Sequence, residues 1–297
     1  MYSTYSQSQF DLYVEARDYF LSNTDQLMKA EEYICRCITE TLTDFREEFT
    51  NDYNEASYLY PFWGSYPPDD RGRKPTGDQF PWIEVGEHTI GHKAERMMGG
   101  RFNIREVGLP SGSDDRFVLS NTALKDILKI TDSVMIFLDT KSTGPNDNEL
   151  DLVVSGYQVS GDGIWNSPTD PLKNTMITTQ GVRSSSLFQP RLSPVYCLSD
   201  GRVLPSAHLF LKVIYSVSPR DNSSGIMHGG QPLSQVTIAC VPNGLLMFCK
   251  PDYHRMYPGL FYPGKDDRST PTEKRRARIG IDKLETIAKW RVHHIYC

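Results

Sequence analysis

Two aspartates and one lysine stand at positions where the sequence can support phosphodiester chemistry. Asp114 lies in the turn GLPSGSDDR, and 25 residues later the apolar run VMIFL leads into Asp139, Thr140 and Lys141. Because side chains alternate along a strand, Asp139 and Lys141 are expected on one face and Thr140 on the other. If the strand after Asp114 pairs with the strand that carries Asp139, two carboxylates and an ammonium group meet at one edge of a sheet.

This cluster suits the hydrolysis of a phosphodiester, in which negative charge develops around phosphorus. Mg²⁺ neutralises such charge and prefers oxygen ligands, which Asp114, Asp139 and the backbone carbonyl of Thr140 can supply. Lys141 can orient or deprotonate the attacking water, or stabilise the transition state as a point charge. Asp139-Thr140-Lys141 is the only acidic-x-Lys triplet in the chain. Such a triplet is a weak motif by itself, so a surface ion pair is the alternative interpretation.

The elements that position these residues alternate between helical and strand-like patterns. Apolar side chains recur at three- and four-residue spacing over residues 25–49, which predicts an amphipathic helix. A second helix is expected at 84–98, a short helical piece at 121–130 and a last helix at 281–290. Strands are expected at 103–108, 116–120, 132–139, 150–155, 194–198, 207–217 and 234–241. This order predicts an α/β fold with a mixed central sheet flanked by helices, as one domain over residues 1–297.

Composition and charge narrow the class of protein. The 297 residues carry a net charge of −5, which by itself disfavours nucleic acid as a partner. However, residues 1–60 have a local charge of −8 and residues 250–297 a local charge of +5, which indicates one polyanion-binding face. The six cysteines lack zinc-finger spacing and are expected as buried free thiols. With no signal peptide or apolar span in the sequence, we expect no membrane association and a cytoplasmic location.

A second chemically informative stretch is PGKDDRSTPTEKRRARIGID, residues 263–282. Arginine and lysine donate to guanine O6 and N7, and a carboxylate accepts from cytosine N4, so this stretch is suited to a G·C-rich sequence. The alternative is that Arg275, Arg276 and Arg278 hold phosphates, which gives affinity without sequence preference. A smaller basic cluster, Arg71, Arg73 and Lys74, lies in the Pro- and Gly-rich loop expected at 60–82.

Long stretches of the chain resemble the BglI family of type II restriction endonucleases, within the PD-(D/E)xK nuclease superfamily. The matching stretches are DYNEASYLYPFWGSYPPDDRG, GDQFPWIEVGE, GLPSGSDDR, FLDTKSTGP, QVSGDGIW, SDGRVLPSAHLFLK, VPNGL and PGKDDR. The resemblance implies a homodimeric, Mg²⁺-dependent site-specific deoxyribonuclease in which Asp114, Asp139 and Lys141 are catalytic. The family's proline before the first acid is Ser113 here. Glu87 also matches, and we include it as a candidate metal ligand.

The resemblance extends to the residues that read DNA. The matching base-reading positions are Lys265, Asp267, Arg276 and Arg278, each with the family's residue type. This implies cleavage of double-stranded DNA at the interrupted palindrome GCC-N₅-GGC, with a catalytic core at about 84–217, a DNA-reading segment at about 250–290 and a cognate methyltransferase in the same bacterium. A catalytically inactive DNA-binding relative and a structure-specific repair nuclease are the alternative functions.

Overall fold

A seven-stranded mixed sheet carries the largest core of the protein. The computed structural model describes residues 7–58, 85–108, 112–143, 149–182, 184–216, 232–264 and 270–297. The strand order is β1-β2-β3-β8-β9-β12, and β7 also pairs with β8. The β3–β8 pair is parallel and the other described pairs of this sheet are antiparallel. The strands are β1 (Asn103–Glu106), β2 (Asp115–Ser120), β3 (Ser133–Thr143), β7 (Val195–Cys197), β8 (Val203–Tyr215), β9 (Leu233–Val241) and β12 (Val292–Tyr296).

The two central strands are buried because both of their faces are covered. Every residue of β8, VLPSAHLFLKVIY, is buried, and so are the first eight residues of β3. Near-continuous apolar sequence is expected where a parallel pair lies inside a sheet and has layers on both sides. Asp139 and Lys141 therefore stand on one strand of this enclosed pair.

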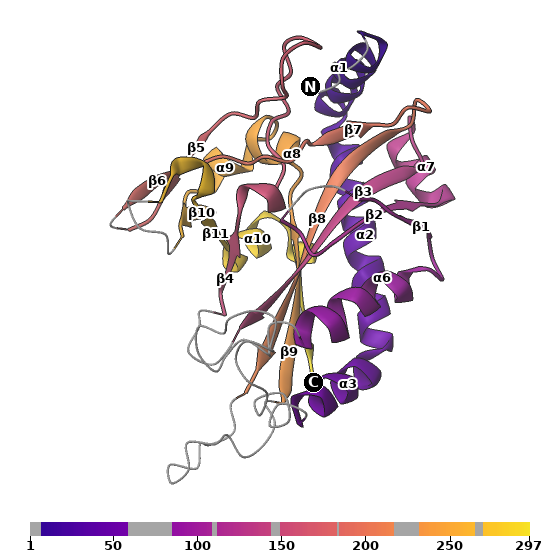
Figure 1. Ribbon diagram of the computed structural model, residues 1–297, viewed down its shortest axis with the longest axis vertical. Helices are drawn as coiled ribbons and strands as arrows, with labels where there is room; N and C mark the ends of the chain where they lie inside the picture. The colour runs from indigo at the N-terminus through magenta and orange to yellow at the C-terminus, as the bar shows by residue number, and fades with distance from the viewer. Residues whose placement is uncertain are drawn as a thin grey trace, which may run out of the picture.

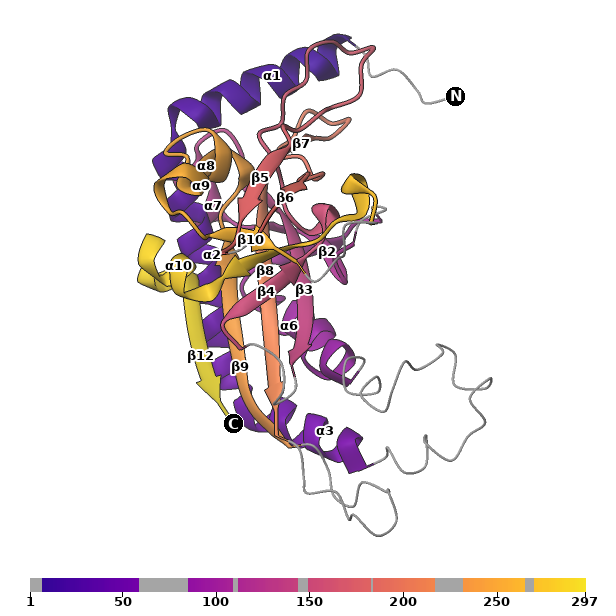
Figure 2. The ribbon, with the colours of Figure 1, turned by 90° about the vertical axis from the view of Figure 1, so that its left-hand side faces the viewer.

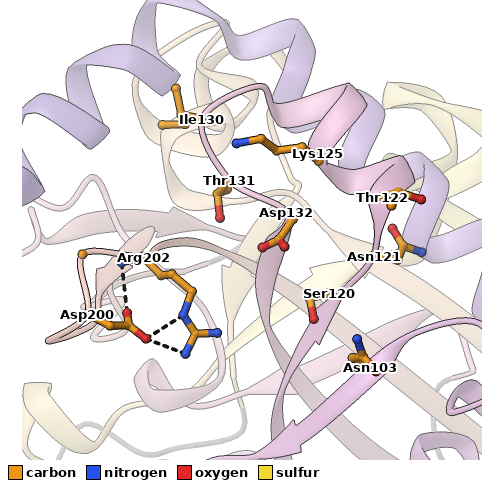
Figure 3. A pocket seen from close by; sticks show the side chains of 11 residues that line it. Asn103, Ser120, Asn121, Thr122, Lys125, Ile130, Thr131, Asp132, Asp200 and Arg202 are labelled. Carbon is orange, nitrogen blue, oxygen red and sulfur yellow. Dashed lines mark hydrogen bonds and ion pairs between the residues drawn. The ribbon is translucent and has the colours of Figure 1, made fainter.

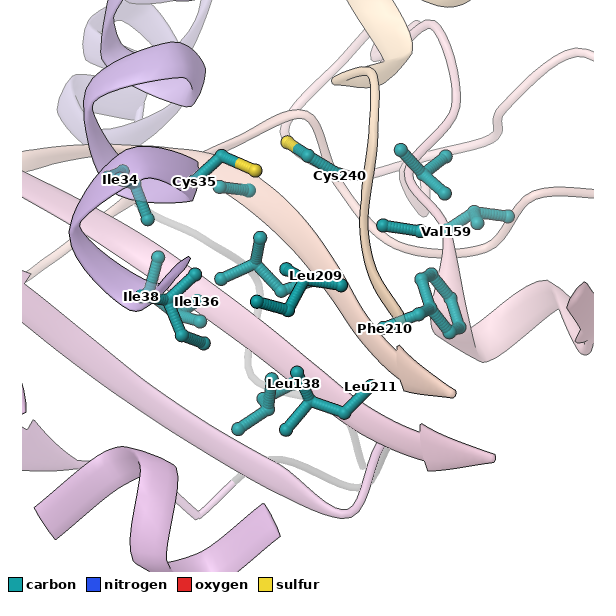
Figure 4. Close-up of a cluster of buried hydrophobic side chains, with 14 of the residues drawn as sticks. Ile34, Cys35, Ile38, Ile136, Leu138, Val159, Leu209, Phe210, Leu211 and Cys240 are labelled. Carbon is teal, nitrogen blue, oxygen red and sulfur yellow. The ribbon is translucent and has the colours of Figure 1, made fainter. Parts of the chain in front are cut away.

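Helices cover one face of this sheet (Figure 1). They are α1 (Gln7–Ser22), α2 (Thr24–Asp44), α3 (Arg46–Tyr58), the π-helix η2 (Glu87–Gly91), α6 (His92–Met98) and α7 (Thr122–Leu128). The apolar stripe of α2 packs on the sheet, where Ile34 and Ile38 lie against Ile136, Leu138 and Leu209 (Figure 4). The even-numbered residues of β3 thus face the helices, and its odd-numbered residues, including Asp139 and Lys141, face the other way.

A smaller three-stranded sheet lies on the other side of the long strands (Figures 1 and 2). Its order is β10-β11-β4, both pairs are antiparallel, and a separate hairpin is formed by β5 and β6. The strands are β4 (Asp151–Val154), β5 (Ile177–Gln180), β6 (Ser185–Phe188), β10 (Phe261–Pro263) and β11 (Ala277–Gly280). The remaining described helices are η3 (Gly156–Gln158), α8 (Gly244–Phe248), α9 (Tyr253–Met256), η4 (Thr272–Lys274), α10 (Ile281–Ile287) and η5 (Lys289–Arg291), of which α8 and η5 contact α2.

The structure confirms the predicted fold class and corrects three of the predicted helices. The helix expected at 25–49 is divided into α2 and α3 at Phe45, which is 39% exposed, so the buried Phe49 belongs to a separate helix. The helix expected at 84–98 has a π-helical first part, and the one expected at 281–290 ends at Ile287, where the chain turns towards β12.

Two further expectations from composition can be compared with the structure. All six cysteines are free thiols, as expected, but only Cys35, Cys37 and Cys240 are buried. The expected burial was wrong for Cys197 and Cys249, which are half-buried, and for Cys297, which is exposed. Within the described ranges, no helix combines the length and the apolar character needed to cross a bilayer.

Candidate active site

The pairing of β2 with β3 brings the two predicted acids together. The antiparallel register places Asp115 opposite Leu138, so the next position outward sets Asp114 opposite Asp139. Asp114 directly precedes β2, where the chain leaves the Gly/Ser-rich turn, and Asp139 lies in the buried part of β3. The convergence expected from the sequence is therefore present in the fold.

Short polar contacts connect the cluster. The Thr140 backbone N–H donates to Asp114 Oδ2 at 2.6 Å, which ties the first acid to the second strand. Lys141 Nζ lies 2.6 Å from Asp139 Oδ2, and the Asp139 side chain is 1% exposed whereas that of Lys141 is 28% exposed. The lysine thus connects a buried carboxylate with the surface.

Burial dominates the electrostatics of both acids. It raises the pKa of Asp139 to about 7, against the opposing effect of the Lys141 ammonium, and the Asp114 carboxylate raises this pKa further. Burial also raises the pKa of Asp114, while the Thr140 N–H and Lys141 act in the opposite direction. Two neighbouring carboxylates that are costly to ionise together are stabilised in their charged form by a cation placed between them.

The donor set fits a hard divalent cation. Asp139 Oδ2 is buried and accepts no well-aligned hydrogen bond, although it lies beside Lys141. Mg²⁺ is commonly held by one or two carboxylates while retaining several waters. Among the described residues no group of three or more His, Cys, Asp or Glu side chains is arranged for a metal. The two acids that stand at the same level of the paired strands as Lys141 are Asp114 and Asp139.

Gln158 is a site residue that the sequence analysis missed. Its Nε2 donates to Asp139 Oδ1 at 2.5 Å and to the Gly112 carbonyl at 2.9 Å, and its Oε1 accepts from Ser155 N at 2.8 Å. The side chain is buried, so it fixes Asp139 and the turn before Asp114 at the same time. The available signal was the Ser-x-x-Gln pattern at 155–158, which forms a capping box, but that pattern does not reveal the contact with Asp139.

The other face of the strand ends carries a contact between a histidine and an aspartate. His92 Nδ1 on α6 lies 2.8 Å from Asp115 Oδ1, and η2 packs so closely on β3 that a Cβ atom on Gly91 would lie 2.6 Å from Thr140 Oγ1. Glu87 belongs to η2, on this Thr140 face, whereas Asp139 and Lys141 project from the opposite face. A metal-binding role for Glu87 therefore remains a prediction.

Two of the four predicted base-reading residues, Arg276 and Arg278, fall on or next to the small sheet. Arg278 lies in β11, and its Nη1 donates to Asp151 Oδ2 of the neighbouring strand β4. Arg276 is exposed directly before β11, and Arg275 Nε donates to the Thr270 carbonyl at 2.9 Å. Lys265 and Asp267 lie outside the described residues, as does the basic cluster at 71–74.

A surface cavity lies away from this cluster. Its volume is about 540 Å³, and its lining includes Ser120 at the end of β2 and Asp132 just before β3 (Figure 3). The acids and Lys141 lie at the opposite ends of these two strands. The cavity also contains Arg202, whose Nε donates to Asp200 Oδ2 at 2.8 Å. The catalytic candidates thus lie at the other ends of β2 and β3 and not in this cavity.

Comparison with known proteins identifies the family of the chain. The family model described as "Restriction endonuclease BglI" matches residues 8–295. The "Type II restriction enzyme BglI" of Bacillus subtilis is 42% identical over 292 residues, which cover 97% of this chain and 96% of the relative. The crystal structure of BglI bound to its DNA recognition sequence superposes with a TM-score of 0.90 at 42% identity, covering 100% of this chain and 99% of that one.

A more distant structure shares the fold alone. Tetrameric restriction endonuclease SfiI, bound to cognate DNA, matches with a TM-score of 0.62 at 12% identity, over 92% of this chain and 85% of that one. The fold is thus that of the type II restriction endonucleases. The chain belongs to the BglI family, and the enzyme class expected from the sequence is confirmed.

Proposed function

We propose that the protein cleaves double-stranded DNA at an interrupted palindrome, with GCC-N₅-GGC as the expected site, and that it requires Mg²⁺. The observation that carries this proposal is the meeting of Asp114, Asp139 and Lys141 where β2 pairs with β3. The 42% identity to the Bacillus subtilis enzyme supports the reaction class. The resemblance of Lys265, Asp267, Arg276 and Arg278 to the family's base-reading residues supports the sequence preference.

In this proposal Asp114 and Asp139 hold the metal, with the Thr140 carbonyl and Glu87 as further candidate ligands. A bound divalent ion supplies a Lewis acid and a more acidic water. Lys141 faces the solvent side of Asp139, where its positive charge can stabilise the negative charge that develops on the attacked phosphate. Gln158 restrains Asp139, so that the carboxylate keeps one orientation while the metal and DNA bind.

We propose that the protein acts as a two-fold homodimer. A palindromic site presents two identical half-sites, and two copies related by a two-fold axis meet both with the same surface. The catalytic core at about 84–217 and the DNA-reading segment at about 250–290 then belong to one domain in each copy. We further propose that the enzyme acts in the bacterial cytoplasm and that a cognate methyltransferase protects the host DNA without contacting it.

The test is cleavage of randomised DNA with Mg²⁺, followed by sequencing of the ends. We expect the cut to fall in the central spacer of GCC-N₅-GGC, and a different fixed sequence would correct the site but not the reaction. Cleavage at structures or mismatches without a fixed sequence would instead support a repair nuclease. Binding to a fixed sequence without cleavage would identify an inactive relative. Sedimentation with cognate duplex at micromolar concentration tests the dimer, which a persistent monomer would refute.

A further inference from the structure

A buried aspartate, Asp151, connects the predicted DNA-reading sheet to the strand beside the catalytic lysine. In the β10-β11-β4 sheet, Arg278 is paired with Tyr262 on one side and with Val153 on the other, and Gly280 is paired with Asp151. Arg278 and Gly280 are two residues apart, so they share one face of β11. The side chains of Tyr262, Arg278 and Asp151 therefore meet on the same face.

The contacts at this meeting point are specific. Asp151 Oδ2 accepts from Arg278 Nη1 and from the Tyr262 hydroxyl, the latter at 2.8 Å. The Asp151 side chain is 4% exposed and that of Arg278 is 13% exposed. Burial raises the pKa of the Tyr262 hydroxyl, and its hydrogen bond to Asp151 raises it further. Tyr262 thus stays a neutral donor, and the carboxylate has cationic and neutral partners in fixed positions.

The backbone of Asp151 is also held, by a hydrogen bond to a buried lysine. Lys212 Nζ donates to the Asp151 backbone carbonyl, and Lys212 is buried on β8. In the parallel register Lys212 is the direct partner of Lys141, so the two lysines project from the same face of adjacent strands. The backbone of β4 is therefore anchored to the strand next to the catalytic cluster, while the carboxylate of the same residue restrains Arg278.

The contact with Asp151 leaves most N–H donors of the Arg278 guanidinium group available for DNA. A guanidinium group has five N–H donors, and two parallel donors on one edge match guanine O6 and N7. A contact through Nη1 leaves the complete edge formed by Nε and Nη2 for a base. Because the side chain is already mostly buried and oriented, less rotamer freedom remains to be lost when DNA binds.

We propose that Asp151 is a positioning residue for base reading. It holds the Arg278 guanidinium group so that one edge of this group is presented to guanine. Asp151 itself is held in place because Lys212 anchors the backbone of β4. The inference rests on the proposed function of Arg278 as a base-reading residue. A purely electrostatic role for Asp151 predicts a different result. Removing its negative charge would then strengthen the binding of every duplex by a similar factor, because DNA is a polyanion.

The experiment measures affinity for the cognate duplex and for duplexes with one base pair altered in each half-site, at two salt concentrations and with Ca²⁺ in place of Mg²⁺. The variants are Asp151→Asn, Arg278→Lys and the double variant. We expect Asp151→Asn to relax discrimination about tenfold, at the same base pair that Arg278→Lys relaxes. The double variant should lose little more than Arg278→Lys alone, since both changes disrupt one unit.

Matched variants separate positioning from folding. Asp162→Asn is the control, because Asp162 is also buried but accepts from Thr175 N and Thr175 Oγ1, away from Arg278. This variant should keep the wild-type discrimination. If Asp151→Asn does not fold, Asp151→Glu keeps the charge and displaces the guanidinium, and it should relax the same base pair.

Four results would overturn the inference. Equal changes for all duplexes in Asp151→Asn, or full discrimination in Asp151→Glu, would show that Asp151 does not orient Arg278. If Arg278→Lys relaxes one base pair and Asp151→Asn relaxes none, base reading by Arg278 stands and only the positioning role fails. If Arg278→Lys itself leaves discrimination unchanged, the base-reading role fails, and the positioning role fails with it.

Discussion

Replacing Gln158 with methionine tests whether the buried amide holds Asp139, the proposed catalytic acid, in place. Methionine has a similar length but removes the donors to Asp139 Oδ1 and the Gly112 carbonyl and the acceptor for Ser155 N. A hydrogen bond to a charged group contributes about 1.5–3 kcal/mol and a neutral one about 1 kcal/mol. The free energy of unfolding should therefore fall by roughly 3–5 kcal/mol, within the ~5–15 kcal/mol typical of a folded domain.

The effect on cleavage should exceed the effect on binding. A misplacement of about 1 Å at a catalytic group can cost about 100-fold in rate, so we expect single-turnover cleavage to slow by about that factor. Affinity for cognate duplex, measured with Ca²⁺ in place of Mg²⁺, should stay near that of the wild type, because Gln158 contacts the acid and its turn.

The matched control is Gln189→Met. Gln189 is a half-buried glutamine whose Nε2 donates to the Asn174 carbonyl at 3.3 Å and not to either acid. This variant should lose about 1 kcal/mol of stability and cleave at the wild-type rate. A folded Gln158→Met variant that cleaves cognate DNA as fast as the wild type would refute the restraint of Asp139.

Three other predictions concern recognition and stability. If Arg276 reads a base, Arg276→Lys should cost about 1–3 kcal/mol of discrimination between cognate and altered duplexes per half-site, while the slope of log affinity against log salt stays unchanged. Equal losses of affinity for all duplexes would instead indicate a phosphate contact. Burial lowers the pKa of His208 to about 3 from 6.5, so between these pH values the unfolded chain binds more protons than the folded chain. His208 should therefore reduce the free energy of unfolding by up to about 1.4 kcal/mol per pH unit as pH falls from 6.5 towards 3. Urea unfolding of the wild type and His208→Gln at several pH values checks this, and identical pH slopes would contradict it. In the wild type the fully buried Arg291 lies 2.8 Å from Glu31 Oε2. Glu31→Gln removes this carboxylate and should lower the free energy of unfolding by about 3–5 kcal/mol. A loss below about 1 kcal/mol in the same assay would show that the pair is dispensable.

The sequence predicted the central elements because their signals are local. The apolar run before Asp139 and the alternation through Lys141 predicted β3 and the face that carries the catalytic candidates. The structure adds the register of β2 against β3, which sets Asp114 opposite Asp139 and which depends on pairing between distant segments. Asp151 could not be recognised from its neighbours in the chain, because its partners Lys212 and Arg278 are 61 and 127 residues away.

The missed elements are short or depend on tertiary packing. The strand β12 follows the last helix within a few residues, where helical periodicity had been extended to residue 290. The strands β10 and β11 have three and four residues and flank the segment 265–269, so their alternation is too short to distinguish from a loop. Helix α1 carries only a weak apolar stripe, in which Tyr13, Ala16 and Phe20 are buried.

The most direct test of the catalytic assignment is single-turnover cleavage of cognate duplex by Asp139→Asn and Lys141→Ala, with cognate affinity measured in parallel. Both residues are proposed to act on the metal and the phosphate and not on the bases. We therefore predict that cleavage falls by several orders of magnitude in each variant while specific binding is retained. Undiminished cleavage by either purified variant would contradict the assignment of this strand edge as the active site.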